Sequence, residues 1–205
     1  MINSKRGRLI VVSGPSGVGK GTVLSEVLKS PEYVYSISAT TRSPRNGEVH
    51  GTNYFFLTHE EFVKKRDEGG FLEWAEYNGN FYGTPKAFVE ETLASGKNVI
   101  LEIDVYGAVQ IKNLYPGALF VFIAPEDIAT LVKRLEGRGT EEESIIKNRI
   151  AIAKKELLCC LMYDYIIINR SGEQKHAAND LVAAVRAESL RPANVFSQIT
   201  DFFTE

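Results

Sequence analysis

The stretch "GPSGVGKGT", Gly14 to Thr22, directly follows the apolar run "LIVVS" and precedes a segment with helical spacing. A glycine-rich turn between a strand and a helix points backbone N–H groups at phosphate oxygens, and a lysine in register reaches the outer phosphates. An ordinary glycine-rich turn would need no lysine at that position, so the stretch predicts a phosphate-binding P-loop. Its predicted nucleotide-binding residues are Gly14, Pro15, Ser16, Gly17, Val18, Gly19, Lys20, Gly21 and Thr22.

The end of this loop narrows the class of protein. Many P-loops carry the hydroxyl that binds Mg²⁺ directly after the lysine, but here Gly21 follows Lys20 and Thr22 comes one position later. The chain also has no Asn-Lys-x-Asp segment, with which GTPases read guanine. A GTPase is therefore disfavoured, and the Gly-Lys-Gly-Thr ending resembles that of small nucleotide kinases. Thr22 is the candidate for a hydroxyl near the metal, directly or through water.

Apolar runs alternate with helical patterns along the chain. The runs are apolar throughout, which suits parallel strands buried on both faces. They predict an α/β fold with three layers around a central, mainly parallel sheet. The expected strands are 8–13, 33–38, 98–104, 118–124 and 163–169, and the expected helices are 21–30, 85–97, 125–139, 144–160 and 177–190.

Two segments interrupt this alternation. The first, Ser36 to Thr84, is rich in Gly, Asn, Tyr and charged residues, and the second is "EGRGTEEES". Inserts on a rigid sheet are where segments that close over substrates usually lie. We expect one domain over 1–205, with a core of 1–35, 89–136 and 150–205, an acceptor-binding region of 36–88 and a short mobile lid of 137–149.

Composition excludes several other classes of protein. The 24 basic and 26 acidic residues give a net charge of -2, which leaves no broad basic surface for nucleic acid or an anionic membrane. No apolar run approaches the roughly 20 residues of a membrane span, and the amino-terminal run is too short for a signal-peptide core. Cys159 and Cys160 are adjacent, so they cannot cross-link distant parts of the fold. We expect a cytoplasmic protein without a nucleic-acid or membrane partner.

The segment "SISATTRSPRNGEVHGTNYFF" holds Arg42, Arg45, Glu48 and Tyr54. Two guanidinium groups and a phenol suit a dianionic phosphate, because arginine binds phosphate bidentately and keeps its charge. A solvated loop is the plain alternative for this segment alone.

The next segment, "FLEWAEYNGNFYGTP", adds Glu73, Tyr82 and Thr84 around a turn, which favours a pocket. At this point the sequence resembles the guanylate kinase family. The stretches "TTRSPRNGEVHG", "FLEWAEYNGNFYGT" and "RLEGRGTEEESI" match the pattern of that family, in its order, and the resemblance covers about Arg8 to Leu190. It implies a P-loop kinase fold that transfers phosphate from ATP, with Mg²⁺, to GMP and dGMP. It also implies that the GMP site consists of Ser38, Arg42, Arg45, Glu48, Tyr54, Glu73, Tyr82, Thr84 and Asp104.

Within that implied set, one group of residues would bind the phosphate of GMP and another would bind its base. The phosphate would be held by Arg42, Arg45, Tyr54 and Tyr82, and the base would face Ser38, Glu73, Thr84 and Asp104. Guanine presents two adjacent donors beside a carbonyl acceptor, which a carboxylate with neighbouring hydroxyls matches. Adenine would leave the carboxylate facing a lone pair, and such mismatches can discriminate by roughly 10⁴ or more. We therefore expect GMP to be preferred over AMP.

The run "VILEID" is an apolar strand that ends in acid, the usual form of the second nucleotide-site motif. Glu102 and Asp104 are two residues apart, so both face the same side of a strand. Because the family places Asp104 toward guanine, Glu102 is the expected residue near Mg²⁺, with a solvent-facing pair as the alternative.

Three arginines are candidates for a lid over ATP. Arg134 and Arg138 are four residues apart on a predicted helix, and Arg149 follows "TEEESIIKN". Together with Lys20 and Arg42 they form the predicted catalytic set. Surface charge is the plain alternative for each, but the flanking glycines and the family pattern favour a lid. After the last strand, Asn169 is the expected contact of the adenine, although Arg170 stands where the family usually continues with acidic residues.

No side chain is required as nucleophile or strong base, because the acceptor is itself a phosphate whose second pKa is near 6. Two other functions stay open. A catalytically inactive guanylate-kinase-like module would bind phosphorylated partners through the acceptor pocket, and a related kinase would keep the P-loop but lose the guanine-reading set. The apolar residues near the carboxyl terminus pack on the core or serve a homo-oligomer such as a dimer.

Overall fold

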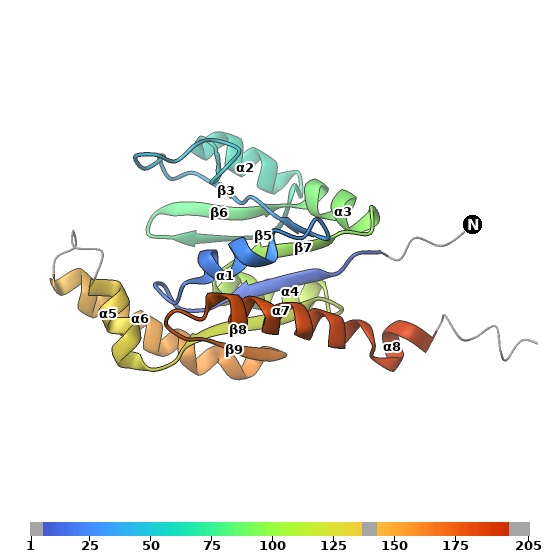
Figure 1. Ribbon diagram of the computed structural model, residues 1–205. Coiled ribbons are helices and arrows are strands. Elements are labelled where there is room, and N and C mark those ends of the chain that lie inside the picture. Colours follow the sequence, from blue (N-terminus) through green and yellow to red (C-terminus); the bar gives the residue numbers. More distant parts are fainter. Residues whose placement is uncertain (1–5, 137–142, 197–205) are drawn as a thin grey trace, which may run out of the picture. The chain divides into compact units, whose positions relative to one another are not determined.

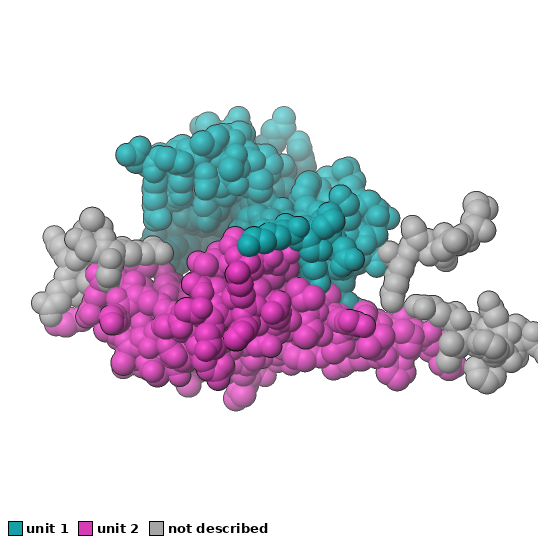
Figure 2. Space-filling view, viewed as in Figure 1, with its two compact units in different colours: residues 1–14, 28–120 teal, residues 15–27, 121–205 magenta. Residues whose placement is uncertain are grey.

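The computed structural model describes residues 6–136 and 143–196, with helices and strands as labelled in Figure 1. The chain divides into two compact units, coloured separately in Figure 2. The first comprises residues 1–14 and 28–120, and the second comprises residues 15–27 and 121–205. The α/β fold class predicted from the sequence is confirmed.

The first unit contains three parallel strands in the order β2 (Tyr33–Tyr35), β7 (Asn98–Glu102) and β1 (Leu9–Ser13). Every residue of β1 is buried, as a strand covered on both faces requires. The register pairs Leu9 with Val99 and Val12 with Glu102. β1 ends at Ser13, so its carboxyl end leads directly into the predicted P-loop, which starts at Gly14.

Two helices accompany these strands, α3 (Lys86–Ala94) and α4 (Val105–Leu114). Pro85 is the N-cap residue of α3, and Gly96 follows its end with a positive φ of 87°, both as expected from the sequence. Helix α4 was not predicted, because β-branched and glycine residues near its start weaken the helical pattern. Its start is fixed instead by Asp104, whose side chain caps it.

The insert of the first unit forms a small sheet of its own, in the order β4 (Phe55–Phe56), β3 (Ala39–Thr40), β6 (Asn80–Pro85) and β5 (Phe71–Tyr77). Helix α2 (His59–Asp67) begins with a complete capping box between Thr58 and Glu61. Phe62 of α2 is fully buried and stacks on Phe71 and Phe81, with ring centroids 4.4 and 5.4 Å away. An aromatic core therefore makes this part of the insert an ordered structure.

The second unit contains β8 (Leu119–Pro125, shared with the first unit at its start) and β9 (Tyr165–Asn169), which pair in parallel. Helix α7 (Gln174–Ser189) packs against α1 (Lys20–Val27) and β9. The other helices are α5 (Ile128–Glu136), α6 (Glu143–Leu158), the 3₁₀ turn η1 (Cys159–Met162) and α8 (Pro192–Val195).

The predicted helix 144–160 thus turns into a 3₁₀ segment at the two cysteines, which are free thiols. Among the helices that the structure describes, none is long and apolar enough to cross a membrane.

Candidate functional site

Glu73 and Thr84 lie side by side on β5 and β6 in the first unit. Both are buried, with 6% and 1% of their surface exposed, and the Thr84 hydroxyl donates a hydrogen bond of 2.6 Å to Glu73 Oε1. The pairing register of the two strands shifts between Phe71 and Trp74, which is the signature of a β-bulge. Bulges re-aim side chains beside functional sites, and this one lies at Glu73.

Burial raises the pKa of the Glu73 carboxyl to about 7. The Thr84 hydrogen bond acts in the opposite direction, and the nearby negative charge of Asp104 adds to the rise. A buried carboxyl that titrates near neutrality is typical of a functional position rather than of a structural ion pair. The hydrogen bond from Thr84 fixes one carboxylate oxygen and leaves the other for a further partner.

Asp104, the third residue predicted at the base, follows β7 and caps α4. Its Oδ1 accepts a hydrogen bond of 2.8 Å from the Gly107 N–H. The side chain is exposed and close enough to Glu73 to influence its pKa. The structure thus brings Glu73, Thr84 and Asp104 into one neighbourhood. Ser38 is half-buried, and its backbone carbonyl accepts from Phe55 N at 2.9 Å.

A second group of predicted residues surrounds Arg42. Both guanidinium nitrogens of Arg42 contact the Glu48 carboxylate at 3.0 Å, in a bidentate ion pair. The same carboxylate accepts the Arg45 backbone N–H at 2.7 Å. These bonds hold the pKa of Glu48 below its usual value, with the Arg42 contact as the largest cause. Glu48 therefore orients Arg42 and closes the loop between the two arginines.

Two tyrosines complete this group. Arg42 lies over the Tyr54 ring, 5.5 Å from its centroid, and the Tyr54 and Tyr82 rings meet edge to face at 6.1 Å. The backbone N–H of Arg42 donates to the buried Thr40 hydroxyl at 3.1 Å. A guanidinium held by a carboxylate on one side and an aromatic face on the other loses little freedom on binding an anion.

Glu102 ends β7 in the same unit. Its carboxylate accepts a hydrogen bond of 3.4 Å from the Tyr35 hydroxyl, and Tyr54 is close enough to feel its charge. Burial, the Glu102 charge and the Glu102 hydrogen bond raise the pKa of Tyr35. Tyr35 was not predicted at the site, because its position within an expected strand, directly before the insert that starts at Ser36, gave no distinguishing signal.

The P-loop residues from Pro15 onward belong to the second unit. Gly17 and Gly19 adopt positive φ angles of 83° and 91°, which L-residues with side chains rarely adopt. A Cβ on Gly17 would also lie 2.7 Å from Leu135 of α5, and one on Gly19 would lie 2.6 Å from Asn169 Nδ2. The glycines are therefore required by both conformation and packing.

Lys20 begins α1, and its ammonium donates to the Pro15 carbonyl at 3.3 Å, across the loop. Arg149 reaches the loop from α6 and donates to Ser16 Oγ at 2.8 Å. Lys20 and Arg149, two of the predicted cations, therefore contact the amino-terminal half of the P-loop. Arg138 lies outside the described residues, as do residues 137–142 of the predicted lid, whereas residues 143–149 of the lid belong to α6.

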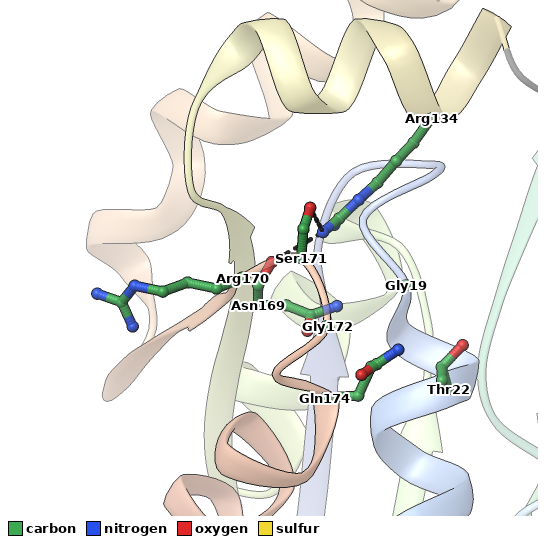
Figure 3. Close-up of a pocket in the computed structure, with 8 residues that line it drawn as sticks. All are labelled: Gly19, Thr22, Arg134, Asn169, Arg170, Ser171, Gly172 and Gln174. Atoms are coloured by element: carbon green, nitrogen blue, oxygen red, sulfur yellow. Dashed lines mark hydrogen bonds between the residues drawn. The ribbon is translucent and has the colours of Figure 1, made fainter.

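A cavity of about 260 Å³ opens beside the P-loop in the second unit (Figure 3). Arg134 crosses one side of it, with hydrogen bonds to the Val18 carbonyl at 3.1 Å, the Asn169 carbonyl at 3.2 Å and Ser171 Oγ at 3.1 Å. The Asn169 side chain donates to the same Val18 carbonyl at 2.8 Å. The lining residues are Gly19, Thr22, Arg134, Asn169, Arg170, Ser171, Gly172 and Gln174.

Four of these lining residues, Arg170 to Gly172 and Gln174, were not predicted. Arg170 to Gly172 belong to the turn between β9 and α7, where Gly172 has a φ of 80°, and Gln174 is the first residue of α7. The available signal was positional, because ligands of open α/β sheets bind outside the carboxyl ends of parallel strands. Figure 3 shows the Arg170 side chain pointing away from the other lining residues, whereas Gln174 lies opposite Thr22. The unusual basic residue after Asn169 thus contributes backbone rather than charge to the cavity.

Comparison with known proteins decides between the families that a P-loop permits. The family model for guanylate kinase matches residues 6–188. The chain belongs to the guanylate kinase family. It is 50% identical over 191 residues to a guanylate kinase of Carboxydothermus hydrogenoformans, covering 93% of each chain, and 48% identical over 193 residues to one of Bacillus subtilis, covering 93% of this chain and 94% of the other.

Among solved structures, the crystal structure of guanylate kinase from Anaplasma phagocytophilum matches this chain with a TM-score of 0.79 at 28% identity, over 99% of this chain and 98% of the other. The resemblance expected from the sequence is thereby confirmed, as is the assignment to a kinase family. The inactive binding module is not favoured, because the guanylate kinase relatives match at about half identity across most of the chain.

Proposed function

We propose that this member of the guanylate kinase family transfers the γ-phosphoryl group of ATP to GMP, and to dGMP, forming ADP and the nucleoside diphosphate. The observation that carries the choice of acceptor is the buried Glu73 carboxylate with the Thr84 hydroxyl beside it. Guanine offers the ring N1–H and the exocyclic amine as adjacent donors. An ionised Glu73 accepts both, whereas adenine presents an acceptor at the equivalent ring nitrogen.

The acceptor phosphate is assigned to the group around Arg42. Arg42 and Arg45 supply charge, and Tyr54 and Tyr82 supply hydroxyl donors, while Glu48 keeps Arg42 in place. With a second pKa near 6, the GMP phosphate is largely dianionic at neutral pH and acts as the nucleophile without a strong base. The residues of this group therefore bind and orient the nucleophile.

The donor is assigned to the second unit. The backbone of the P-loop and Lys20 bind the phosphates of ATP, and Arg149 lies at the same loop through Ser16. The base of ATP is assigned to the cavity between Arg134 and the turn after Asn169. Catalysis then rests on positioning and charge neutralisation, the main terms in phosphoryl transfer. Arg138 keeps its predicted role in the lid as part of this proposal.

Mg²⁺ is implied by the family, and the residues present fit it in the manner usual for a nucleotide kinase. Within the described parts of the chain no three His, Cys, Asp or Glu side chains gather into a metal site. Such a cluster is not needed, since Mg²⁺ in kinases is bound mainly by phosphates, waters and one or two protein oxygens. Thr22, which lines the cavity of the second unit, is a predicted source of such an oxygen. Glu102, which ends β7 in the first unit, is the other predicted ligand. Bound Mg²⁺ neutralises charge on the phosphates.

The test is turnover of purified protein with Mg-ATP and each nucleoside monophosphate, measured as ADP formation. We expect rapid turnover with GMP and dGMP and little with AMP. Equal rates with AMP and GMP would contradict the acceptor assignment. Glu73→Gln should raise the KM for GMP and leave the KM for ATP unchanged; if both constants are unaltered, Glu73 does not contact the base.

Two further expectations from the sequence belong to this proposal. The two free cysteines suit the reducing cytoplasm, where ATP and GMP are available. A homodimer is proposed because Leu190 and Phe196, near the carboxyl-terminal end of the described chain, are 66% and 56% exposed. Light scattering of the purified protein tests the second expectation, and a monomer at micromolar concentration contradicts it.

A further inference from the structure

Helix α4 contains a glycine at a position that does not need one for its backbone. Gly107 is the third residue of the helix and buried, and its φ lies outside the positive region that favours glycine. Glycine at a helical position is less favourable than alanine, because it loses more backbone freedom on folding. The chain therefore keeps a residue that weakens α4, and the reason must lie in the surroundings.

The surroundings are the Glu73 carboxyl. A Cβ on Gly107 would lie 2.9 Å from Glu73 Oε2 and 3.4 Å from its Cδ, with Ile103 Cδ1 at 3.3 Å. On the other side, Glu73 Oε1 is held by Thr84 at 2.6 Å. The carboxyl group thus lies between a hydroxyl that fixes one oxygen and a helix whose missing side chain makes room for the other.

The carboxyl group has little freedom to move away from an added methyl group. Glu73 is 6% exposed and Thr84 is 1% exposed, and both belong to paired strands. A shift of Oε2 would therefore rotate the carboxylate plane or lengthen the Thr84 hydrogen bond. Either change misaligns a bidentate acceptor, whose two hydrogen bonds depend on direction.

We propose that Gly107 is a positioning residue that determines guanine specificity, because the absence of its side chain sets the orientation of the Glu73 carboxylate. This inference rests on the proposed contact between Glu73 and the base. Gly107 contributes no atom to the reaction and acts only through Glu73. It is distinct from a merely structural glycine, because alanine at this position should favour the helix while it impairs the site.

The experiment compares Gly107→Ala with Gly117→Ala, an identical change at an exposed glycine whose Cβ would meet no atom within 4 Å. We expect Gly107→Ala to raise the KM for GMP about tenfold, equivalent to one misaligned charged hydrogen bond. The KM for ATP should stay unchanged, and Tm should equal or exceed that of the wild type. The KM for IMP, which lacks the exocyclic amine, should rise much less than the KM for GMP. The ratio of kcat/KM for GMP to that for IMP should therefore decrease. Gly117→Ala should change none of these.

A double-mutant cycle with Glu73→Gln separates this inference from the proposed function. In the Glu73→Gln background the effect of Gly107→Ala on the KM for GMP should fall below about twofold, because the two positions act through one contact. If Glu73→Gln itself leaves the KM unchanged, the base contact is wrong. If Glu73→Gln raises the KM but Gly107→Ala does not, only the role of Gly107 is overturned. Equal losses with GMP and IMP together with a lowered Tm would also overturn it.

Ile103 provides a second variant in case the single change prevents folding. Gly107→Ala combined with Ile103→Val removes the other close neighbour of the new methyl group and leaves Glu73 as the main obstacle. Ile103→Val alone is the control. A raised KM for GMP in the double variant relative to this control supports the inference, and an equal KM overturns it.

Discussion

The buried Glu73 carboxyl makes the stability of the protein depend on pH in a direction opposite to that of most carboxylates. Its pKa is raised from 4.5 to about 7, first by burial and then by Asp104. The folded protein therefore holds a proton that the unfolded chain releases between about pH 4.5 and pH 7. Stability from this group is complete below pH 4.5, falls as pH rises and levels off above 7. At about 1.4 kcal/mol per pKa unit, ionisation inside the fold costs about 3 kcal/mol.

Glu73→Gln removes this cost, because the amide stays neutral and can still accept from Thr84. Without nucleotide, the unfolding free energy of the variant should exceed that of the wild type by about 1 kcal/mol at pH 5 and by about 3 kcal/mol at pH 8. Urea denaturation of both proteins across this range measures the difference. A difference that stays constant with pH would refute the raised pKa and the burial argument behind it.

The same carboxyl should link GMP binding to protons. Guanine donors stabilise the ionised form, so binding near pH 6 should release a proton and weaken as pH falls below 7, by up to about tenfold per pH unit. Calorimetric titration in two buffers of different ionisation enthalpy counts the protons. Because the GMP phosphate itself titrates near pH 6, the Glu73→Gln variant is the control, and a proton count equal in both proteins would assign the release to the phosphate alone.

Three other changes test the remaining assignments. Lys20→Ala should lower kcat by at least about 10²-fold with an unchanged circular dichroism spectrum, since a charge on the transferring phosphate is lost; a smaller loss would argue against its role. Glu48→Gln should raise the KM for GMP several-fold without affecting ATP, because Arg42 loses its bidentate partner, and steady-state kinetics with each substrate varied distinguish the two. Asn169→Ala should lower the free energy of unfolding by about 1 to 3 kcal/mol, because the Val18 carbonyl loses the hydrogen bond from the Asn169 side chain. Urea denaturation measures this change, and an unchanged midpoint would contradict it.

Much of the core could be predicted from the sequence, because its strands are continuous apolar runs and because proline and glycine mark the ends of a helix. A strand forms within each of the five predicted segments, although β2, β7 and β9 are two or three residues shorter than expected, and Pro85 and Gly96 mark the ends of α3 as expected. Helix α4 was missed because its helical signal is weakened by Gly107, which the structure relates to Glu73 rather than to the backbone. The preference of helices for residues other than glycine is violated at Gly107, next to the candidate base-binding residue Glu73.

Within the candidate site, the residue types indicated which chemical groups the site binds, but they did not indicate which side chains form hydrogen bonds or ion pairs with one another. Glu48 stays a predicted residue of the GMP site, and the structure adds that its carboxylate is bound to Arg42 and to the backbone of Arg45. Arg134 stays predicted to face the transferring phosphate, and the structure adds that its guanidinium bonds to the Val18 and Asn169 carbonyls. The Arg134 contacts join residues far apart in the chain, so no local pattern could reveal them. The Glu48 contacts are local, but residue types alone do not show whether a carboxylate binds a neighbouring arginine or the nucleotide.

The Val18 carbonyl receives hydrogen bonds from both the Asn169 side chain and Arg134. The phosphate loop and the wall of the neighbouring cavity are therefore held in one arrangement before any nucleotide arrives. The conformational entropy of ordering these groups is lost during folding rather than during binding, which leaves more of the contact energy for affinity. An inhibitor directed at this cavity would meet a rigid template, and its own rigidity should matter more than its capacity to adapt.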